Sequence, residues 1–197
     1  MYSALIFFQL SVLTDKYMKL QKKIVFLDGD GTLWYPQATK RTQKPHWIYH
    51  DLETKDNYLK HLELTPQTKE TLEALREKGI YLVVLSANPS TEEVAIKEIQ
   101  ERLEYFGLSS LFYTHRSSSG DDPNGKASIM LEILSSLGLS KEEALMVGDS
   151  YFYDYLAAKN IGIDAFFIEN SVSKMPEEIP QDLKSIKEIH ELLDILA

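Results

Sequence analysis

Five short apolar segments, separated by stretches with helical periodicity, constrain the fold more than any other feature of the chain. Between them, apolar residues recur every three or four positions, which predicts helices. Short buried strands that alternate with helices predict an α/β fold, with a doubly wound parallel sheet covered by helices on both faces. The expected strands are residues 23–27, 80–85, 111–115, 144–147 and 164–168.

Stop signals delimit the helices that we expect between these strands. A glycine follows each of the first three, as is common after the last turn of a helix. The final segment has apolar residues at helical spacing and is expected to be an amphipathic helix. The expected helices are residues 65–78, 91–106, 126–137, 151–161 and 185–196.

The N-terminal segment is expected to be an extension of a single domain. Residues 3–13 are apolar but too short to span a bilayer. No positive charge precedes them and no small-x-small cleavage site follows, so a signal peptide is disfavoured. We therefore expect an extension over residues 1–17, one domain over residues 18–197, and a cytoplasmic location.

Residues 35–64 break the alternation and are expected to form an inserted flap. The flap is rich in basic and aromatic residues, whereas the whole chain has a formal net charge of −9. The overall acidity disfavours nucleic acid and anionic membranes as partners. The flap could contact an anionic substrate or simply pack onto the core. His46 and His50 are poor candidates for metal ligands, because nothing near them in sequence completes a site.

The chain contains no cysteine, which narrows the possible chemistry. Disulfides, zinc–thiolate sites, iron–sulfur clusters and cysteine nucleophiles are excluded. The remaining metal ligands are mainly carboxylates, which favour hard cations such as Mg²⁺.

Polar side chains follow the predicted strands at the edge where an open parallel sheet binds its ligands. They include Asp28 and Asp30 after the first strand, and Asp149 and Asp154 after the fourth. Four crowded carboxylates would repel one another unless a cation lay among them. The other candidates near this edge are Thr32, Ser86, Ala87, Arg116 and Lys126.

Four motifs in this order resemble those of the haloacid dehalogenase (HAD) superfamily. They are DGDGT at residues 28–32, LVVLS ending at Ser86, Lys126, and VGDSYFYD at residues 147–154. The resemblance implies a Rossmann-like fold. Residues 35–64 and 86–126 are too short for full cap domains, so the chain is most similar to the capless magnesium-dependent phosphatase and acid phosphatase branch. Gly29 departs from the pattern, because relatives more often carry a larger residue there.

The resemblance also implies roles for the residues at the strand ends. Asp28 would be the nucleophile that forms an aspartyl-phosphate, and Asp30 would be the general acid and base. Asp28, Asp149 and the backbone carbonyl of Asp30 would hold Mg²⁺. Asp154 would support the site by orienting Lys126 or a metal-bound water. Thr32, Ser86, Ala87, Lys126 and Arg116 would contact or support the phosphate or the substrate.

The function expected from this resemblance is Mg²⁺-dependent hydrolysis of a phosphomonoester. The substrate would be a phosphorylated small molecule, such as a sugar phosphate, or a phosphoprotein carrying phosphotyrosine. Two alternatives stay open: a phosphotransferase or phosphomutase, which must exclude water, and a catalytically silent binding module. A dehalogenase is disfavoured, since it would need neither Asp30 nor the metal-binding aspartates.

Overall fold

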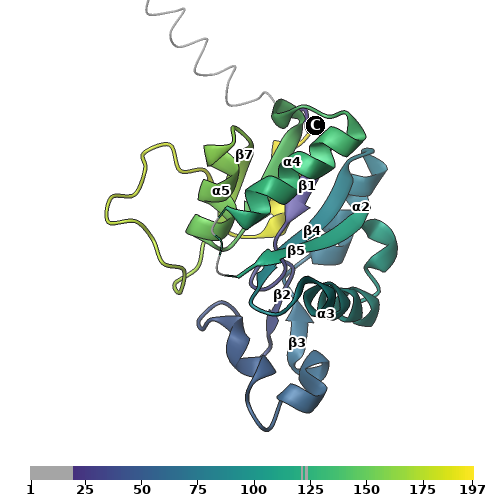
Figure 1. The fold of residues 1–197 in the computed structure, drawn as a ribbon, viewed down its shortest axis with the longest axis vertical. Coiled ribbons are helices and arrows are strands. Elements are labelled where there is room, and N and C mark those ends of the chain that lie inside the picture. Colours follow the sequence, from purple (N-terminus) through teal and green to yellow (C-terminus); the bar gives the residue numbers. More distant parts are fainter. Residues whose placement is uncertain (1–19, 121, 123) are drawn as a thin grey trace, which may run out of the picture.

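A computed structural model describes residues 20–120, 122 and 124–197, and its centre is a six-stranded parallel sheet (Figure 1). The strand order is β5-β4-β1-β6-β7-β8, so the chain runs outward in one direction from β1 and in the other from β6. This confirms the predicted doubly wound α/β fold. The strands are β1 (Ile24–Leu27), β4 (Tyr81–Asn88), β5 (Thr114–Ser119), β6 (Ala144–Gly148), β7 (Asp164–Ile168) and β8 (Ser185–Ile186).

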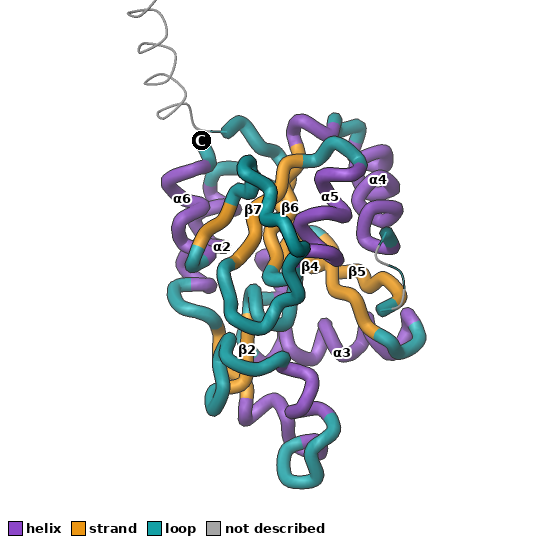
Figure 2. The backbone as a smooth tube through the Cα atoms, turned by 90° about the vertical axis from the view of Figure 1, so that its left-hand side faces the viewer, coloured by secondary structure: helices purple, strands orange, loops and turns teal. Residues whose placement is uncertain are grey.

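Alternating side chains of the central strands supply two separate hydrophobic cores. Val25 and Leu27 belong to one buried cluster, and Ile24 and Phe26 belong to the other. The first cluster includes residues of α2 (Thr68–Glu77), α3 (Glu92–Tyr105) and α6 (Leu192–Ile195). The second includes residues of α4 (Gly125–Leu137), the π-helical segment η5 (Tyr151–Leu156) and α5 (Ala157–Asn160). Figure 2 shows α2 and α6 on one side of the strands and α4 and α5 on the other.

A two-stranded antiparallel sheet follows β1 and projects at the bottom of Figure 1. Its strands are β2 (Trp34–Pro36) and β3 (Leu62–Leu64), with Trp34 opposite Leu64. Two 3₁₀ segments, η1 (Pro45–Tyr49) and η2 (Lys55–His61), lie between them. The flap was expected at residues 35–64, but β2 begins one residue earlier, so the name flap refers to residues 34–64 from here on. Residues 1–17 lie outside the described residues, and the division into an extension and one domain stays a prediction.

Several expected bounds differ from the structure. Strand β4 was expected to end at residue 85 but runs to Asn88, so Ser86 and Ala87 lie within the strand, and the helix expected from residue 65 begins at Thr68. The third strand was expected at residues 111–115, but η3 (Ser109–Leu111) comes first and β5 begins at Thr114. Strand β5 pairs with β4 from Val83 opposite Thr114 to Asn88 opposite Ser119. This pairing uses backbone hydrogen bonds, so the strand can form although its side chains are polar.

The expected C-terminal helix over residues 185–196 is wrong in its first turn. Ser185 and Ile186 instead pair with β7 and complete the edge of the sheet. The helical part is limited to η6 (Ile189–Glu191) and α6, and it starts where Glu188 and Glu191 form a capping box. A further short segment, η4 (Lys141–Glu143), precedes β6. Within the part of the chain that the structure describes, no helix has the length and apolar character needed to cross a membrane.

Candidate active site

The loop after β1 holds Asp28 in a tightly closed backbone turn. The amide of Asp28 donates to the carbonyl of Val147 at 3.0 Å, which ties the end of β1 to β6. The carbonyl of Gly29 accepts from the amide of Leu33 at 2.8 Å. A Cβ added at Gly29 would lie 2.8 Å from the indole of Trp34. Trp34 therefore fills the space that a larger residue would take, which gives a physical reason for glycine at this position.

Lys126 is a buried cation between two aspartates. Its residue is 1% exposed, and its Nζ lies 2.5 Å from Asp28 Oδ1 and 2.6 Å from Asp154 Oδ1. The second oxygen of Asp154 accepts from the amide of Ser150 at 2.9 Å. Both oxygens of Asp154 are thus engaged, so this side chain orients the lysine.

Asp149 follows β6 and lies against the loop after β1. A Cβ at Gly31, where φ is 83°, would overlap the Asp149 carboxylate. Glycine is needed here both for the backbone conformation and for the close approach of the carboxylate.

The carboxylates of the site outnumber its buried cation, and their pKa values show this. Burial raises the pKa of Asp28 to about 7; Lys126 opposes the increase, and the negative charge of Asp154 adds to it. Burial, followed by the charges of Asp28 and Asp154, raises the pKa of Asp149 well above its ordinary value. A second cation would remove this repulsion.

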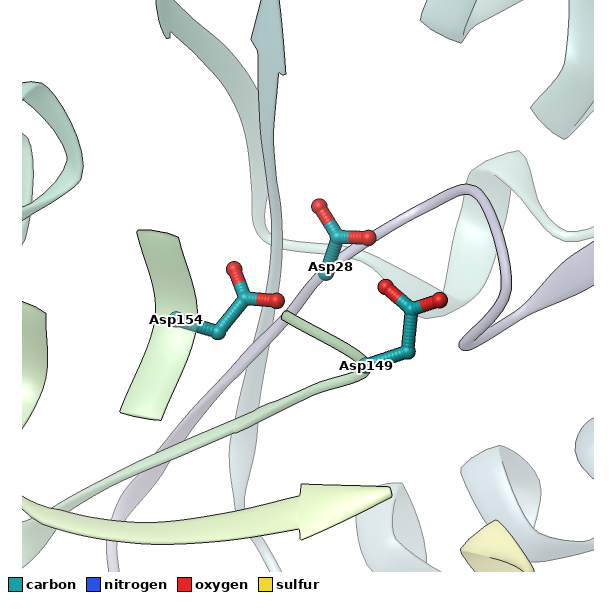
Figure 3. A group of neighbouring side chains, drawn as sticks. All are labelled: Asp28, Asp149 and Asp154. Carbon is teal, nitrogen blue, oxygen red and sulfur yellow. The ribbon is translucent and has the colours of Figure 1, made fainter. Parts of the chain in front are cut away.

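The donor set suits a hard divalent cation. Asp28, Asp149 and Asp154 each offer a carboxylate oxygen, and these atoms lie within 4.8 Å of one another. Figure 3 shows the three carboxylates close together, with Asp154 on the helical segment η5. All donors are oxygens, as Mg²⁺ prefers. Because Asp154 is occupied by Lys126 and Ser150, Asp28 and Asp149 are the side chains best placed to hold the ion.

Asp30 lies outside this carboxylate group and has different partners. Its Oδ1 accepts from the indole Nε1 of Trp34 at 2.7 Å and from the phenol of Tyr49 at 2.6 Å. Tyr49 belongs to η1 in the flap. Burial, together with the neighbouring Asp30 charge, raises the pKa of Tyr49 well above its ordinary value, so the phenol keeps its proton.

Arg102 of α3 supports Tyr49 and was missed in the sequence. Its guanidinium lies 4.6 Å from the Tyr49 ring centre and 5.0 Å from that of Tyr58. The residue is 5% exposed. One feature of the sequence could have indicated a buried role for Arg102: it lies three residues after Ile99, where a basic side chain interrupts the apolar side of the helix.

One cavity of about 740 Å³ brings most of the expected site residues together. The flap contributes Lys44, His46, Tyr49 and His50 to its wall, and the segment after β7 contributes Lys174. Arg102 also lines it. The expected residues in the lining are Asp28, Asp30, Ser86, Ala87, Lys126, Asp149 and Asp154.

Two expected site residues lie outside the cavity lining. Arg116 on β5 pairs with Glu132 at 3.0 Å and with Glu92 at 3.6 Å. Thr32 is fully buried in the loop after β1, where its carbonyl accepts from Thr65 Oγ1 at 2.7 Å. These contacts give Arg116 and Thr32 structural roles, and their expected roles toward substrate stay predictions.

Comparisons with known proteins agree with this geometry. Residues 9–168 match the family described as haloacid dehalogenase-like hydrolase. Over 115 residues, the chain is 30% identical to ribulose-1,5-bisphosphate 5-phosphatase of Halopiger xanaduensis, a match covering 58% of this chain and 46% of that protein. Over 174 residues the chain is 33% identical to PpaX of Caldanaerobacter subterraneus, a protein assigned by name to the pyrophosphatases. This match covers 82% of this chain and 73% of that protein.

A solved structure shares the fold. The HAD phosphatase of Thermococcus onnurineus superposes with a TM-score of 0.60 at 24% identity, covering 88% of this chain and 97% of that one.

The match over more than half of its length shows that the chain belongs to the haloacid dehalogenase-like hydrolase family. It spans less than half of the Halopiger relative and about three quarters of the Caldanaerobacter relative.

Proposed function

We propose that this protein is a Mg²⁺-dependent phosphatase that hydrolyses a phosphomonoester through an aspartyl-phosphate on Asp28. One observation carries the proposal: Lys126 is buried against Asp28 inside a group of carboxylates that still lacks positive charge. A divalent cation would offset the excess negative charge of this group and would allow an anionic phosphoryl group to bind beside Lys126. The phosphatase names of the two relatives support the same class of reaction.

The residues have distinct tasks in the first step. A carboxylate oxygen of Asp28 attacks phosphorus, the bond between phosphorus and the ester oxygen breaks, and Asp30 donates a proton to the leaving alcohol. Lys126 keeps its charge, because the two aspartates beside it raise its pKa despite burial. The positive charge faces the phosphoryl oxygens as negative charge develops there.

In the second step, Asp30 accepts a proton from water, and the water oxygen attacks the phosphorus of the aspartyl-phosphate. Free phosphate leaves and the Asp28 carboxylate is restored. Ser86 and the Ala87 amide line the same cavity and would hold phosphate oxygens. Asp28 and Asp149 would hold Mg²⁺, and the ion would supply charge neutralisation for the phosphoryl oxygens.

The substrate class proposed is a phosphorylated small molecule. A cavity of about 740 Å³ lies in the size range of small-molecule sites. Two flap histidines and Lys44 in its wall suit an anionic or hydroxylated leaving group. A cytoplasmic location is proposed with it.

A panel of sugar phosphates, nucleotides and phosphopeptides tests this function, with phosphate release measured with and without Mg²⁺. We expect Mg²⁺-dependent release from at least one class of ester. Mass spectrometry of the products, with a sugar acceptor present, identifies a phosphotransferase. No release and no transfer from any member of the panel would contradict the proposal.

A further inference from the structure

Among the residues that the structure describes, the side-chain partners of the Asp30 carboxylate meet one of its oxygens. Trp34 Nε1 and the Tyr49 phenol both donate to Oδ1, at 2.7 and 2.6 Å. These two donors come from different places: Trp34 starts β2, close to the loop of the nucleophile, and Tyr49 ends η1. The side chain is thereby fixed in rotation, and Oδ2 is the oxygen left to exchange a proton with a reacting group.

Tyr49 is itself fixed by contacts with α3. The Arg102 guanidinium lies over the Tyr49 ring and over the Tyr58 ring, and the two rings meet edge to face at 5.2 Å between centres. Arg102 is 5% exposed, and its Nε has no hydrogen-bond partner among the described residues. The guanidinium also lies 3.9 Å from Glu98 on its own helix, so ring stacking and this ion pair together connect the flap to α3 at this point.

We propose that Tyr49 is a positioning residue for the general acid, holding Asp30 Oδ1 so that Oδ2 faces the leaving-group oxygen. This rests on the proposed phosphatase function. A flap residue then acts on the chemical step through Asp30, rather than only on the choice of substrate. The phenol contributes orientation, and misorientation of a catalytic group by a small distance costs a large factor in rate.

The test compares leaving groups of similar size. p-Nitrophenol leaves readily and needs little protonation, whereas phenol needs more, so a misplaced acid slows phenyl phosphate more than p-nitrophenyl phosphate. We expect Tyr49→Phe, which keeps the ring over Arg102, to lower kcat/KM for phenyl phosphate by about 10-fold more than kcat/KM for p-nitrophenyl phosphate, because kcat/KM reports the step in which the leaving group departs.

Tyr58→Phe is the matched control. It removes a phenol that donates to Glu101 at 3.2 Å, and no hydrogen bond to Asp30 is lost with it. The ratio of the two rates should equal that of the wild type. A second control is the double variant: in an Asp30→Asn background, Tyr49→Phe should add no further loss, because its effect passes through Asp30.

The outcomes separate this inference from the function on which it rests. If Tyr49→Phe slows both esters equally, leaves both unchanged, or keeps its full effect in Asp30→Asn, the positioning role is overturned while the phosphatase stands. If the wild type with Mg²⁺ hydrolyses neither ester nor any member of the substrate panel, both proposals fall.

Discussion

The two ends of the central sheet each bury a lysine beside an aspartate, with opposite electrostatic results. At the amino ends of the strands, Lys22 Nζ lies 2.7 Å from Asp164 Oδ2, and the hydrogen bond and charge of Lys22 lower the pKa of Asp164 although burial raises it. At the carboxyl ends, Lys126 lies 2.5 Å from Asp28, yet the pKa of Asp28 is raised to about 7.

Part of the difference is burial, because Asp28 is 7% exposed and the Asp164 side chain 30%, and part lies in the surrounding charges. Asp164 has a second lysine, Lys184, at 3.3 Å, so cations outnumber the carboxylate. Asp28 shares its lysine with Asp154 and has Asp149 close by. Two lysines around one carboxylate favour its charged form and stabilise the fold, whereas a group of carboxylates with excess negative charge is suited to bind a cation. The contrast supports the proposal that the site lies at the carboxyl end.

The largest expected effect is loss of turnover at the carboxyl end. Asp28→Asn removes the nucleophile and should lower kcat on the order of 10⁴-fold or more. Trapping of the phosphate mimic BeF₃⁻, followed by mass spectrometry or fluorine NMR, should be lost as well. Asp164→Asn is the matched control at the other end and should retain the wild-type kcat. Normal turnover by Asp28→Asn would rule out the covalent mechanism.

Asp30→Asn should give the next largest effect. Loss of a positioned general acid and base typically slows a reaction by about 10² to 10⁴-fold. Unlike Asp28→Asn, this variant should still accept the phosphoryl group from p-nitrophenyl phosphate, and the intermediate should accumulate because water activation is lost. A burst of nitrophenol in stopped-flow kinetics measures it. A rate equal to that of the wild type would remove Asp30 from the mechanism.

We expect metal removal to change activity through the carboxyl end of the sheet and to leave the ion pair at the amino end unaffected. Chelation with EDTA should abolish activity and Mg²⁺ should restore it, whereas Ca²⁺ should inhibit, because its larger and looser coordination misplaces the nucleophile. Added Mg²⁺ should raise the melting temperature of the wild type and of Asp164→Asn, but much less that of Asp149→Asn. Full activity after thorough chelation would exclude the metal site.

Much of this arrangement follows from local sequence, and the remainder depends on tertiary contacts. The apolar runs of β1, β6 and β7 and the polar residues at their ends place Asp28 and Asp149 at one edge. Strand β5 has the polar sequence THRSSS, so apolar patterning could not identify its bounds. The roles of Tyr49 and Arg102 depend on how the flap packs on α3, which no local periodicity encodes.

Breaking the ion pair at the amino end should cost stability without affecting turnover. Lys22→Met leaves Asp164 without its closest cation, and with the Asp164 side chain 30% exposed, water reduces the penalty. We expect a loss of about 1–2 kcal/mol in the free energy of unfolding, below the range for fully buried pairs. Urea denaturation measures this loss, and kcat should be unchanged. An unaltered urea midpoint would show that the pair contributes no net stability.

The smallest effect is a difference in pH dependence. The lowered pKa of Asp164 contributes stability above its ordinary value of 3.8 that is lost as pH falls through the folded pKa. The raised pKa of Asp28 acts with the opposite sign: metal-free protein loses stability as pH rises from about 4 to about 7. Melting temperatures without metal should show both trends. In a plot of melting temperature against pH, Asp164→Asn should remove the change at acid pH, and Asp28→Asn should remove the change between about pH 4 and about pH 7.

The position of Lys126, which is 98 residues after its partner Asp28, also matters while the chain is being made. During synthesis, Asp28 leaves the ribosome long before Lys126 and Asp149, so the early chain holds neither the buried cation nor the crowded carboxylates. The like charges meet only once β6 has been added beside β1, when the hydrophobic cores on both faces of the sheet can offset their repulsion. A nascent chain that ends before β6 therefore has no assembled centre, and the centre can form only after β6 has joined β1.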